Sequence, residues 1–150
     1  MRVVLQRVAE ASVKIDGAEV GKIAKGFLIL LGITHGDEES DIDWLVRKIG
    51  ALRVFEDSEG RMNLSINEIG GNALVVSQFT LYASTRKGNR PSFVHSAAPD
   101  YAEPLYEMFC QKLGAELGRT VQTGRFGADM QVSLVNDGPV TIIIDSRMRE

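Results

Sequence analysis

The chain has 150 residues, and its 17 lysines and arginines against 20 aspartates and glutamates give a formal net charge of −3. This charge excludes a histone-like or polybasic protein. The 44% share of hydrophobic residues, with 15 glycines and 4 prolines, is typical of an ordinary folded domain rather than of a disordered, collagenous or disulfide-rich chain. Because a domain of this size buries enough surface for one core without metal or disulfide crosslinks, we expect a single domain over residues 1–150.

The cysteine count and the apolar runs indicate the cellular compartment. Cys110 is the only cysteine, so it cannot form an internal disulfide, and it fits a reducing compartment. The start of the chain, Met1–Arg7, carries a charge every few residues and does not resemble a signal peptide. The longest apolar run, Phe27–Ile33, is far shorter than the ~20 residues of a membrane span. We therefore expect a cytoplasmic protein without a membrane segment.

The first part of the chain has the pattern of β-strands. Asp16-Gly17 predicts a hairpin turn, because both residues tolerate positive φ. We predict strands at Arg2–Val8, Ala11–Ile15, Ala18–Ile23 and Phe27–Ile33.

A helix is predicted after the polar segment His35–Glu39. Ser40, followed three residues later by Asp43, is an acceptable N-terminal capping signature. Apolar side chains then recur at helical spacing, at Ile42, Leu45, Val46 and Ile49.

The rest of the chain adds strands, a second helix and one long irregular segment. Ala83–Pro99 is longer than a simple connection and suits a functional loop. Tyr101–Leu117 is predicted to be an amphipathic helix that ends near Gly118. Strands are predicted at Arg53–Phe55, Ala73–Phe79, Val121–Thr123, Asp129–Val135 and Val140–Ile144, with a turn at Asp57–Gly60. About eight strands and two helices indicate an α/β domain, with a mixed β-sheet or flattened barrel and the helices on one side.

Most standard enzyme templates are missing from the sequence. There are only two histidines, His35 and His95, and we find no nucleophile elbow, phosphate-binding loop or Cys/His metal spacing. The segment His35–Glu39 is either a cation site or, more commonly for acidic residues before a helix, a solvated turn that favours the helix dipole. Cys110 lies on the apolar side of the second predicted helix and is expected to be a small core residue.

A local positive patch stands out against the acidic total. Between Glu68 and Asp100 the sequence has no acidic residue. Screening beyond ~8–10 Å hides remote carboxylates, so such a patch can bind phosphate. Cations beside an aromatic ring suit an unpaired RNA end, whereas the alternative is a solvated loop. The candidate RNA-binding residues are Arg86, Lys87, Arg90 and Phe93.

Two short segments combine polar side chains with backbone features suited to a pocket. Ser77, Gln78, Phe79 and Thr80 follow a buried strand, where hydroxyls, a carboxamide and free backbone N–H groups could orient a carbonyl or a water. The segment Asn136–Thr141 is predicted to be a tight turn between two strands. In it, glycine removes a Cβ and proline fixes φ, so the corner is stiff and can approach a ligand closely.

Together these segments resemble the paired signature of the D-aminoacyl-tRNA deacylases, the D-tyrosyl-tRNA(Tyr) deacylase family. The signature is Ser-Gln-Phe-Thr-Leu at 77–81 and Asn-Asp-Gly-Pro-Val-Thr at 136–141. Similarity extends over essentially the whole chain, at Leu5–Val8, Glu56-Asp57, Met62–Ser65, Lys87–Phe93 and Gln122–Ala128.

The resemblance implies an α/β fold particular to that family and a homodimeric hydrolase without a cofactor or metal. Its substrate would be the ester between a D-amino acid, or glycine mischarged on tRNA(Ala), and the 3′-terminal ribose of tRNA. In the family, a cis Gly138-Pro139 corner of one subunit would enter the pocket of the other and reject L-residues by exclusion, a chiral proofreading device. Because only about 5–6% of X-Pro bonds in folded proteins are cis, the sequence without the resemblance would predict a trans bond.

The sequence leaves two candidates for the nucleophile, the Thr80 hydroxyl and a positioned water. Thr80 is the obvious hydroxyl for covalent attack, but no base lies beside it in the sequence. We favour a positioned water, with Ser77, Gln78 and the N–H groups of Phe79 and Thr80 polarising the ester carbonyl while the ribose 2′-hydroxyl assists. The rival functions are a non-catalytic RNA-end binding module, a small-molecule esterase and an editing domain for L-residues.

Overall fold

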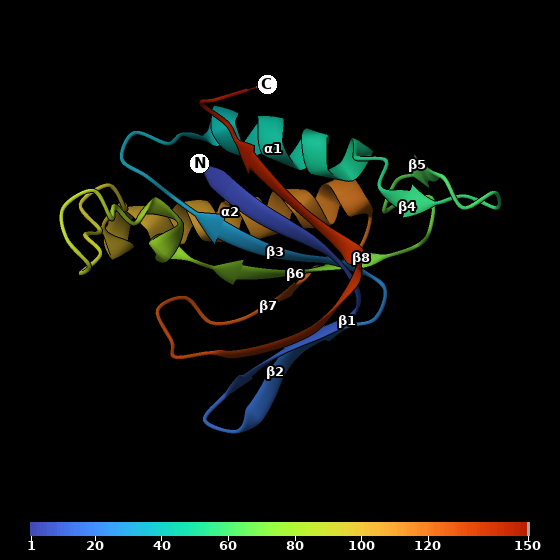
Figure 1. Ribbon diagram of the computed structural model, residues 1–150, viewed down its shortest axis with the longest axis horizontal. Coiled ribbons are helices and arrows are strands. Elements are labelled where there is room, and N and C mark those ends of the chain that lie inside the picture. The colour runs from blue at the N-terminus through green and yellow to red at the C-terminus, as the bar shows by residue number, and fades with distance from the viewer. Residues whose placement is uncertain (150) are drawn as a thin grey trace.

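The computed structural model describes residues 1–149, which form eight strands, two α-helices and one 3-10 helix (Figure 1). In chain order these elements are β1 (Arg2–Ile15), β2 (Ala18–Ile23), β3 (Gly26–Gly32), α1 (Glu39–Ala51), β4 (Phe55–Glu56), β5 (Met62–Leu64), β6 (Asn72–Ser77), the 3-10 helix η1 (Phe79–Tyr82), α2 (Pro99–Leu117), β7 (Gln122–Thr123) and β8 (Gln131–Asp145).

The long strand β1 organises a mixed sheet of order β2-β1-β3-β6-β7, with β8 also paired to β1. The pairs of β1 are antiparallel, whereas β3–β6 and β6–β7 are parallel. The sheet curls until β2 approaches β7, where a Cβ on Gly21 would lie only 2.7 Å from the Thr123 carbonyl oxygen. The prediction of a mixed sheet closing into a flattened barrel is confirmed.

Both helices cover the same side of the sheet, as predicted (Figure 1). The helical spacing of Ile42, Leu45, Val46 and Ile49 is confirmed, since all four are buried in the main core. From α2, Phe109 and Leu113 join the same core. No helix among residues 1–149 is both long and apolar enough to cross a bilayer.

The N-terminus of α1 begins earlier than predicted. Glu38, not Ser40, is the capping residue, and its backbone N–H donates to Asp41 Oδ2 at 2.9 Å. The reciprocal capping box formed by Glu38 and Asp41 satisfies two otherwise unpaired N–H groups, which explains why the helix begins before Ser40. The predicted end of α2 at Gly118 is confirmed, because Gly118 adopts the left-handed conformation with φ +65°.

The predicted tight turn at Asn136–Thr141 is wrong, because the segment lies inside β8. The strands predicted at Asp129–Val135 and Val140–Ile144 are one strand, and Arg2–Val8 and Ala11–Ile15 are likewise joined in β1. The chain stays extended because β1 and β8 pair on both sides of an irregularity. Gln6 pairs with Thr141 and Val8 with Asn136, so residues 137–140 form a wide bulge opposite Arg7.

Two smaller expectations also change, and a third is confirmed. The strand predicted at Ala73–Phe79 ends at Ser77, because the chain turns into η1 at Phe79. The strand predicted at Arg53–Phe55 is shifted to β4, which pairs with an unpredicted strand, β5. Cys110 packs partly buried against the core as expected, and burial raises the pKa of its thiol to about 12.

Candidate functional site

The segment Ser77–Thr80 turns sharply from the end of β6 into η1. Ser77 pairs with Leu31 of β3, and the Gln78 backbone N–H donates to the Leu31 carbonyl at 2.8 Å. The Gln78 side-chain amide donates to the Thr80 hydroxyl. The N–H groups of Phe79 and Thr80 begin η1 and therefore have no acceptor within that helix. The four predicted residues are thus brought together as one polar cluster.

This cluster lies at the edge of a mainly apolar cavity of about 570 Å³. Ser77, Gln78 and Phe79 line it, together with apolar side chains from β3 and the start of α2. Such a volume falls in the usual range for ligand pockets, which combine apolar walls with a few placed polar groups. The arrangement can hold an apolar or aromatic group and present amide and hydroxyl groups to it.

The predicted loop closes one side of the cavity. Phe93 stacks edge-on against Phe79 with 5.0 Å between ring centroids. Ser96 adds a hydrogen bond from its hydroxyl to the Phe79 carbonyl at 2.7 Å. Phe79 itself is 58% exposed, so the aromatic pair forms part of the rim rather than of the core.

The remaining cavity residues were missed by the sequence reasoning. They lie in the segment between β7 and β8 and at the start of β8, and similarity to the family motif at Gln122–Ala128 was the only signal pointing there. The walls contributed by this region are Phe126, Gly127, Ala128, Met130 and Val132.

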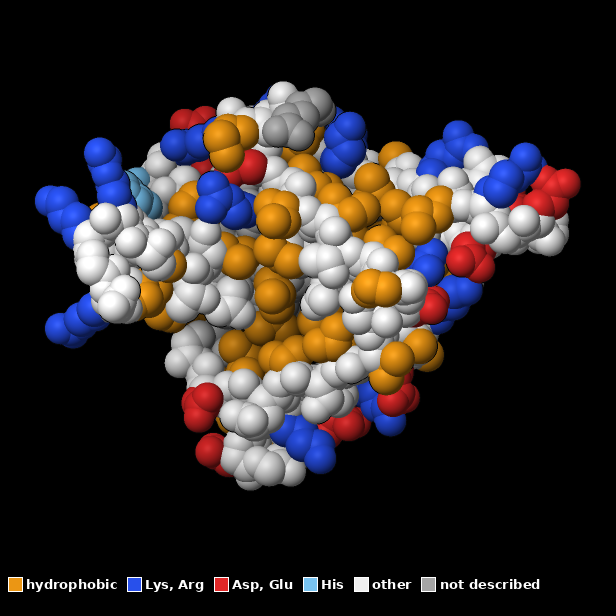
Figure 2. Space-filling model, in the orientation of Figure 1, with side chains coloured by type: hydrophobic (Ala, Val, Ile, Leu, Met, Phe, Trp, Pro, Cys, Tyr) orange, Lys and Arg blue, Asp and Glu red, His pale blue; other side chains and the backbone are white. Residues whose placement is uncertain are grey.

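The predicted cationic residues lie in the same irregular loop but outside the cavity. Arg86, Lys87 and Arg90 are all exposed. Figure 2 shows Lys and Arg side chains projecting at the end of the molecule where this loop lies in Figure 1. The structure therefore puts free cations beside, rather than in, the pocket.

The Gly138-Pro139 bond is cis and lies in the wide bulge of β8. Arg7, only 4% exposed, holds this corner from behind. Its Nε donates to the Asp137 carbonyl at 2.9 Å and its Nη1 to the Val54 carbonyl at 2.7 Å. Asn136 closes the base of the bulge by donating to the carbonyls of Arg7 and Val140.

Within one chain, the corner and the polar cluster are far apart. The bulge lies opposite Arg7, which pairs with Phe27, and Phe27 pairs with Ala73. Ser77 is four residues further along β6, about 13 Å away at 3.3 Å per residue, and three strand spacings of about 4.8 Å separate β8 from β6. One chain therefore does not bring Gly138-Pro139 to its own Ser77–Thr80.

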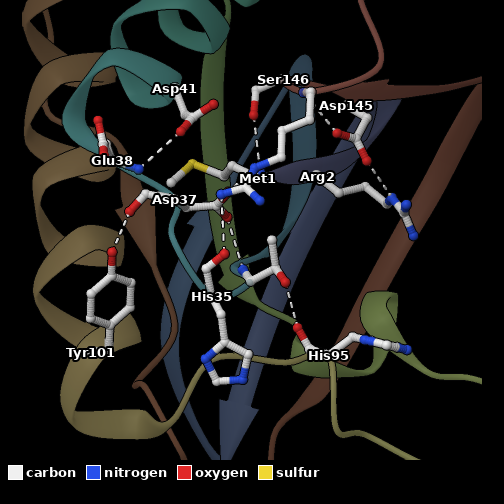
Figure 3. Close-up of polar contacts among 12 residues, drawn as sticks. Met1, Arg2, His35, Asp37, Glu38, Asp41, His95, Tyr101, Asp145 and Ser146 are labelled. Carbon is white, nitrogen blue, oxygen red and sulfur yellow. Dashed lines mark hydrogen bonds and ion pairs between the residues drawn. The ribbon is translucent and has the colours of Figure 1, made fainter.

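The solvated-turn interpretation of His35–Glu39 is confirmed for Glu38 and Glu39, which are exposed where α1 begins, but it is wrong for Asp37, which forms a buried structural junction. Asp37 is fully buried, and its Oδ1 lies 2.6 Å from the Met1 amino group, which also donates to Ser146 (Figure 3). Its Oδ2 accepts the Thr34 N–H at 2.8 Å. Within residues 1–149, no cluster of three or more His, Cys, Asp or Glu side chains is placed to hold a metal ion.

Comparisons with known proteins identify the family of the chain. The family model described as D-Tyr-tRNA(Tyr) deacylase matches residues 4–145. Two curated relatives named D-aminoacyl-tRNA deacylase align over the full length of both chains, one from Porphyromonas gingivalis at 62% identity and one from Opitutus terrae at 60%.

Two solved structures have the same fold. One, named c-Myc DNA Unwinding Element Binding Protein, has a TM-score of 0.91 and 40% identity and covers 97% of this chain and 98% of its own. The other, a probable eukaryotic D-amino acid tRNA deacylase, has a TM-score of 0.82 at 18% identity and covers 95% of this chain and 97% of its own. With a family model matching nearly the whole chain and full-length relatives at this identity, the chain belongs to the D-Tyr-tRNA(Tyr) deacylase family and is a hydrolase that acts on ester bonds.

Proposed function

We propose that this protein hydrolyses the ester between a D-amino acid and the 3′-terminal ribose of tRNA and releases the free D-amino acid and tRNA. The observation that carries the proposal is the polar cluster Ser77–Thr80 at the edge of the 570 Å³ cavity, in a chain of this family. A mainly apolar cavity suits the terminal nucleoside, and the polar edge suits the ester. The substrate puts the reaction in the cytoplasm, where tRNA is charged.

The chemistry we propose uses a water and the substrate's own 2′-hydroxyl rather than a covalent intermediate. Among residues 1–149, the hydrogen-bond partner of the Thr80 hydroxyl is the Gln78 amide, which is not a base. An unactivated threonine is a poor nucleophile. The two N–H groups at the start of η1 would instead stabilise the negative charge that develops on the carbonyl oxygen. Water then adds to the carbonyl carbon, and the 3′-oxygen leaves with a proton.

The Gly138-Pro139 corner would provide chiral selection as a rigid backbone element. A main-chain corner can hold the α-amino group and leave no room on the side where an L side chain projects, so D-residues with different side chains are accepted. Glycine has no side chain to be excluded and would also be accepted. Glycine mischarged on tRNA(Ala) is therefore a second proposed substrate.

A homodimer would bring the corner of one copy into the cavity of the other. Within one chain the two are held at opposite ends of the sheet, whereas Gly138 and Pro139 are exposed and available to a second copy. β8 also leaves Leu134, Val135 and Ile143 exposed. Figure 2 shows apolar side chains gathered on the face that carries β8, and exposed apolar patches of this kind mark interfaces.

The direct test incubates the protein with matched D- and L-tyrosyl-tRNA and measures free tyrosine. Release of D-tyrosine alone supports the proposal, and release of neither D- nor L-tyrosine would contradict it. Equal release of both would favour an L-editing domain, and hydrolysis of D-tyrosine ethyl ester at the same efficiency would favour a small-molecule esterase. Tight binding of uncharged RNA without any hydrolysis would favour the non-catalytic RNA-end binding module.

A further inference from the structure

A second, polar recess lies directly behind the wall of the cavity. Its volume is about 370 Å³, and its lining includes Arg2, Thr34, Tyr82, His95, Asp145 and Arg147. Both spaces are lined by η1 and by the end of the following loop: Phe79 and Ser96 line the cavity, and Tyr82 and His95 line the recess. A strand whose last nucleoside fills the cavity would therefore pass close to the recess.

Asp145 in the recess and the buried Asp37 next to it are already paired with protein cations. Asp145 accepts Arg2 Nε on Oδ2 at 3.0 Å and the Arg147 backbone N–H on Oδ1 at 2.9 Å (Figure 3). Asp37 is paired with the Met1 amino group and with Arg147 Nε at 3.2 Å. Among the residues that line the recess, Arg2 and Arg147 carry two positive charges against the single carboxylate of Asp145, so the recess favours an anion.

Arg147 is held ready to contact such an anion. Its Nε faces Asp37, and its Nη2 donates to the His35 carbonyl at 3.1 Å. A guanidinium has five N–H donors, and within residues 1–149 these two contacts leave the others available. The side chain is still 46% exposed, so it is fixed in direction and open to a ligand, which lowers the entropic cost of binding.

Tyr82 contributes a second unused donor. Its hydroxyl is the one buried side-chain polar atom without a hydrogen-bond partner among residues 1–149. Burial, with Asp37 and Asp145 nearby, raises the pKa of this hydroxyl well above its usual value, so it keeps its proton. Buried polar atoms are rarely left unpaired, and an acceptor bound in the recess would satisfy this one.

We infer that the recess binds a backbone phosphate of the tRNA strand leading to the 3′ end, with Arg147 and the Tyr82 hydroxyl as donors. The inference rests on the proposed function and adds a contact site to it. Guanidinium groups match phosphate geometry. The exposed cations Arg86, Lys87 and Arg90 belong to the same loop as His95 and would continue the path of the strand.

The test compares Arg147→Gln with a control, Arg47→Gln, which removes an exposed arginine of α1 that does not line the recess. For Arg147→Gln we expect KM for D-tyrosyl-tRNA to rise about tenfold more than KM for D-tyrosyl-adenosine, which carries no phosphate. The dependence of tRNA affinity on salt should also weaken, by about 0.7 in the slope of log K against log salt. The control should match the wild type in both.

A second variant separates the contact from folding, because Arg147 also pairs with Asp37. Tyr82→Phe removes only the unpaired hydroxyl, so we expect normal thermal unfolding, roughly threefold weaker tRNA binding and an unchanged salt slope. Wild-type affinity and slope in Arg147→Gln, or equal losses on both substrates, would overturn the inference. Failure of the proposed function gives a separate result, because the wild type would then hydrolyse neither D-tyrosyl-tRNA nor D-tyrosyl-adenosine.

Discussion

Gly138 has a backbone conformation and surroundings that leave no room for a side chain. Its φ is +134°, and an added Cβ would lie 2.8 Å from Val140 Cγ2 and 3.1 Å from Arg7 Nη2. For Gly138→Ala we expect a displaced corner, a loss of about 1–3 kcal/mol of unfolding free energy and at least about a tenfold fall in D-tyrosyl-tRNA hydrolysis.

Gly60→Ala is the matched control for that change. Gly60 also has a left-handed φ, +74°, but nothing lies within 4 Å of an added Cβ. Gly60→Ala should lower the unfolding free energy and leave the deacylation rate unchanged. Equal rates for Gly138→Ala and Gly60→Ala would contradict a role for the corner.

Thr80 distinguishes the two versions of the chemistry. If its hydroxyl only orients groups, Thr80→Ala should lower the single-turnover rate by about tenfold, the effect of one hydrogen bond. Loss of a covalent nucleophile would cost about 10⁴-fold or more. Thr80→Ser, which keeps the hydroxyl, serves as the control. If Thr80→Ala lowered the single-turnover rate by about 10⁴-fold while substrate binding stayed intact, the result would support Thr80 as a covalent nucleophile.

The ribose 2′-hydroxyl gives a complementary test on the substrate. D-tyrosyl-tRNA ending in 2′-deoxyadenosine should be hydrolysed at least about 100-fold more slowly, because proton transfer by a positioned group is worth about that much. Single-turnover rates at saturating enzyme measure this effect separately from binding. An unchanged rate would require a base from the protein instead.

At the scale of elements, Asp145 joins the end of β8 to the start of β1 through Arg2. Burial raises the pKa of this carboxyl, but hydrogen bonds from the Arg147 N–H and from Arg2 outweigh it and hold the pKa below the usual 3.8. The carboxylate therefore stabilises the fold above pH 3.8, and this contribution is lost as the pH falls through the lower, folded-state pKa.

The measurement is the thermal unfolding of wild type and Asp145→Asn between pH 7 and pH 3. The wild type should be the more stable at neutral pH, and the difference should shrink below pH 3.8. Asp129→Asn, at an exposed position, should show no such difference. A difference that stays constant down to the lowest pH would contradict the assignment.

Local patterns predicted most elements because periodicity and turn chemistry act within a few residues. The apolar spacing of α1 and the Asp16-Gly17 turn, where both residues have positive φ, are of this kind. The bulge in β8 was mistaken for a turn because only its long-range pairing with β1 keeps Asn136–Thr141 extended. A Gly-Pro pair by itself fits both a tight turn and a bulge within a strand.

The site was predictable only where it carries polar side chains. Ser77, Gln78 and Thr80 were found because their chemistry is visible in the sequence, and the structure brings them together. Met130 and Phe126 were not found, because their place in the cavity wall depends on the tertiary path of the segment between β7 and β8. Asp37 was misjudged because its partners, Met1 and Arg147, are remote in the sequence.

At the scale of the whole molecule, the composite site that we propose needs two copies, because one chain keeps its two parts far apart. The polar cluster and cavity lie at one end of the sheet, and the Gly138-Pro139 corner lies at the other. A twofold arrangement would pair each cavity with the partner's corner, and each dimer would then carry two composite sites. The central claim is that two copies together make the D-selective deacylase.

Mixing two inactive variants, Gly138→Val and Gln78→Ala, tests this claim most directly. Each variant alone should fail to release D-tyrosine from D-tyrosyl-tRNA, since one lacks the corner and the other the polar cluster. After unfolding and refolding an equal mixture, about one quarter of the wild-type activity should return, because half of the dimers are mixed and each has one intact site. Refolded mixed dimers without any D-tyrosine release would contradict it.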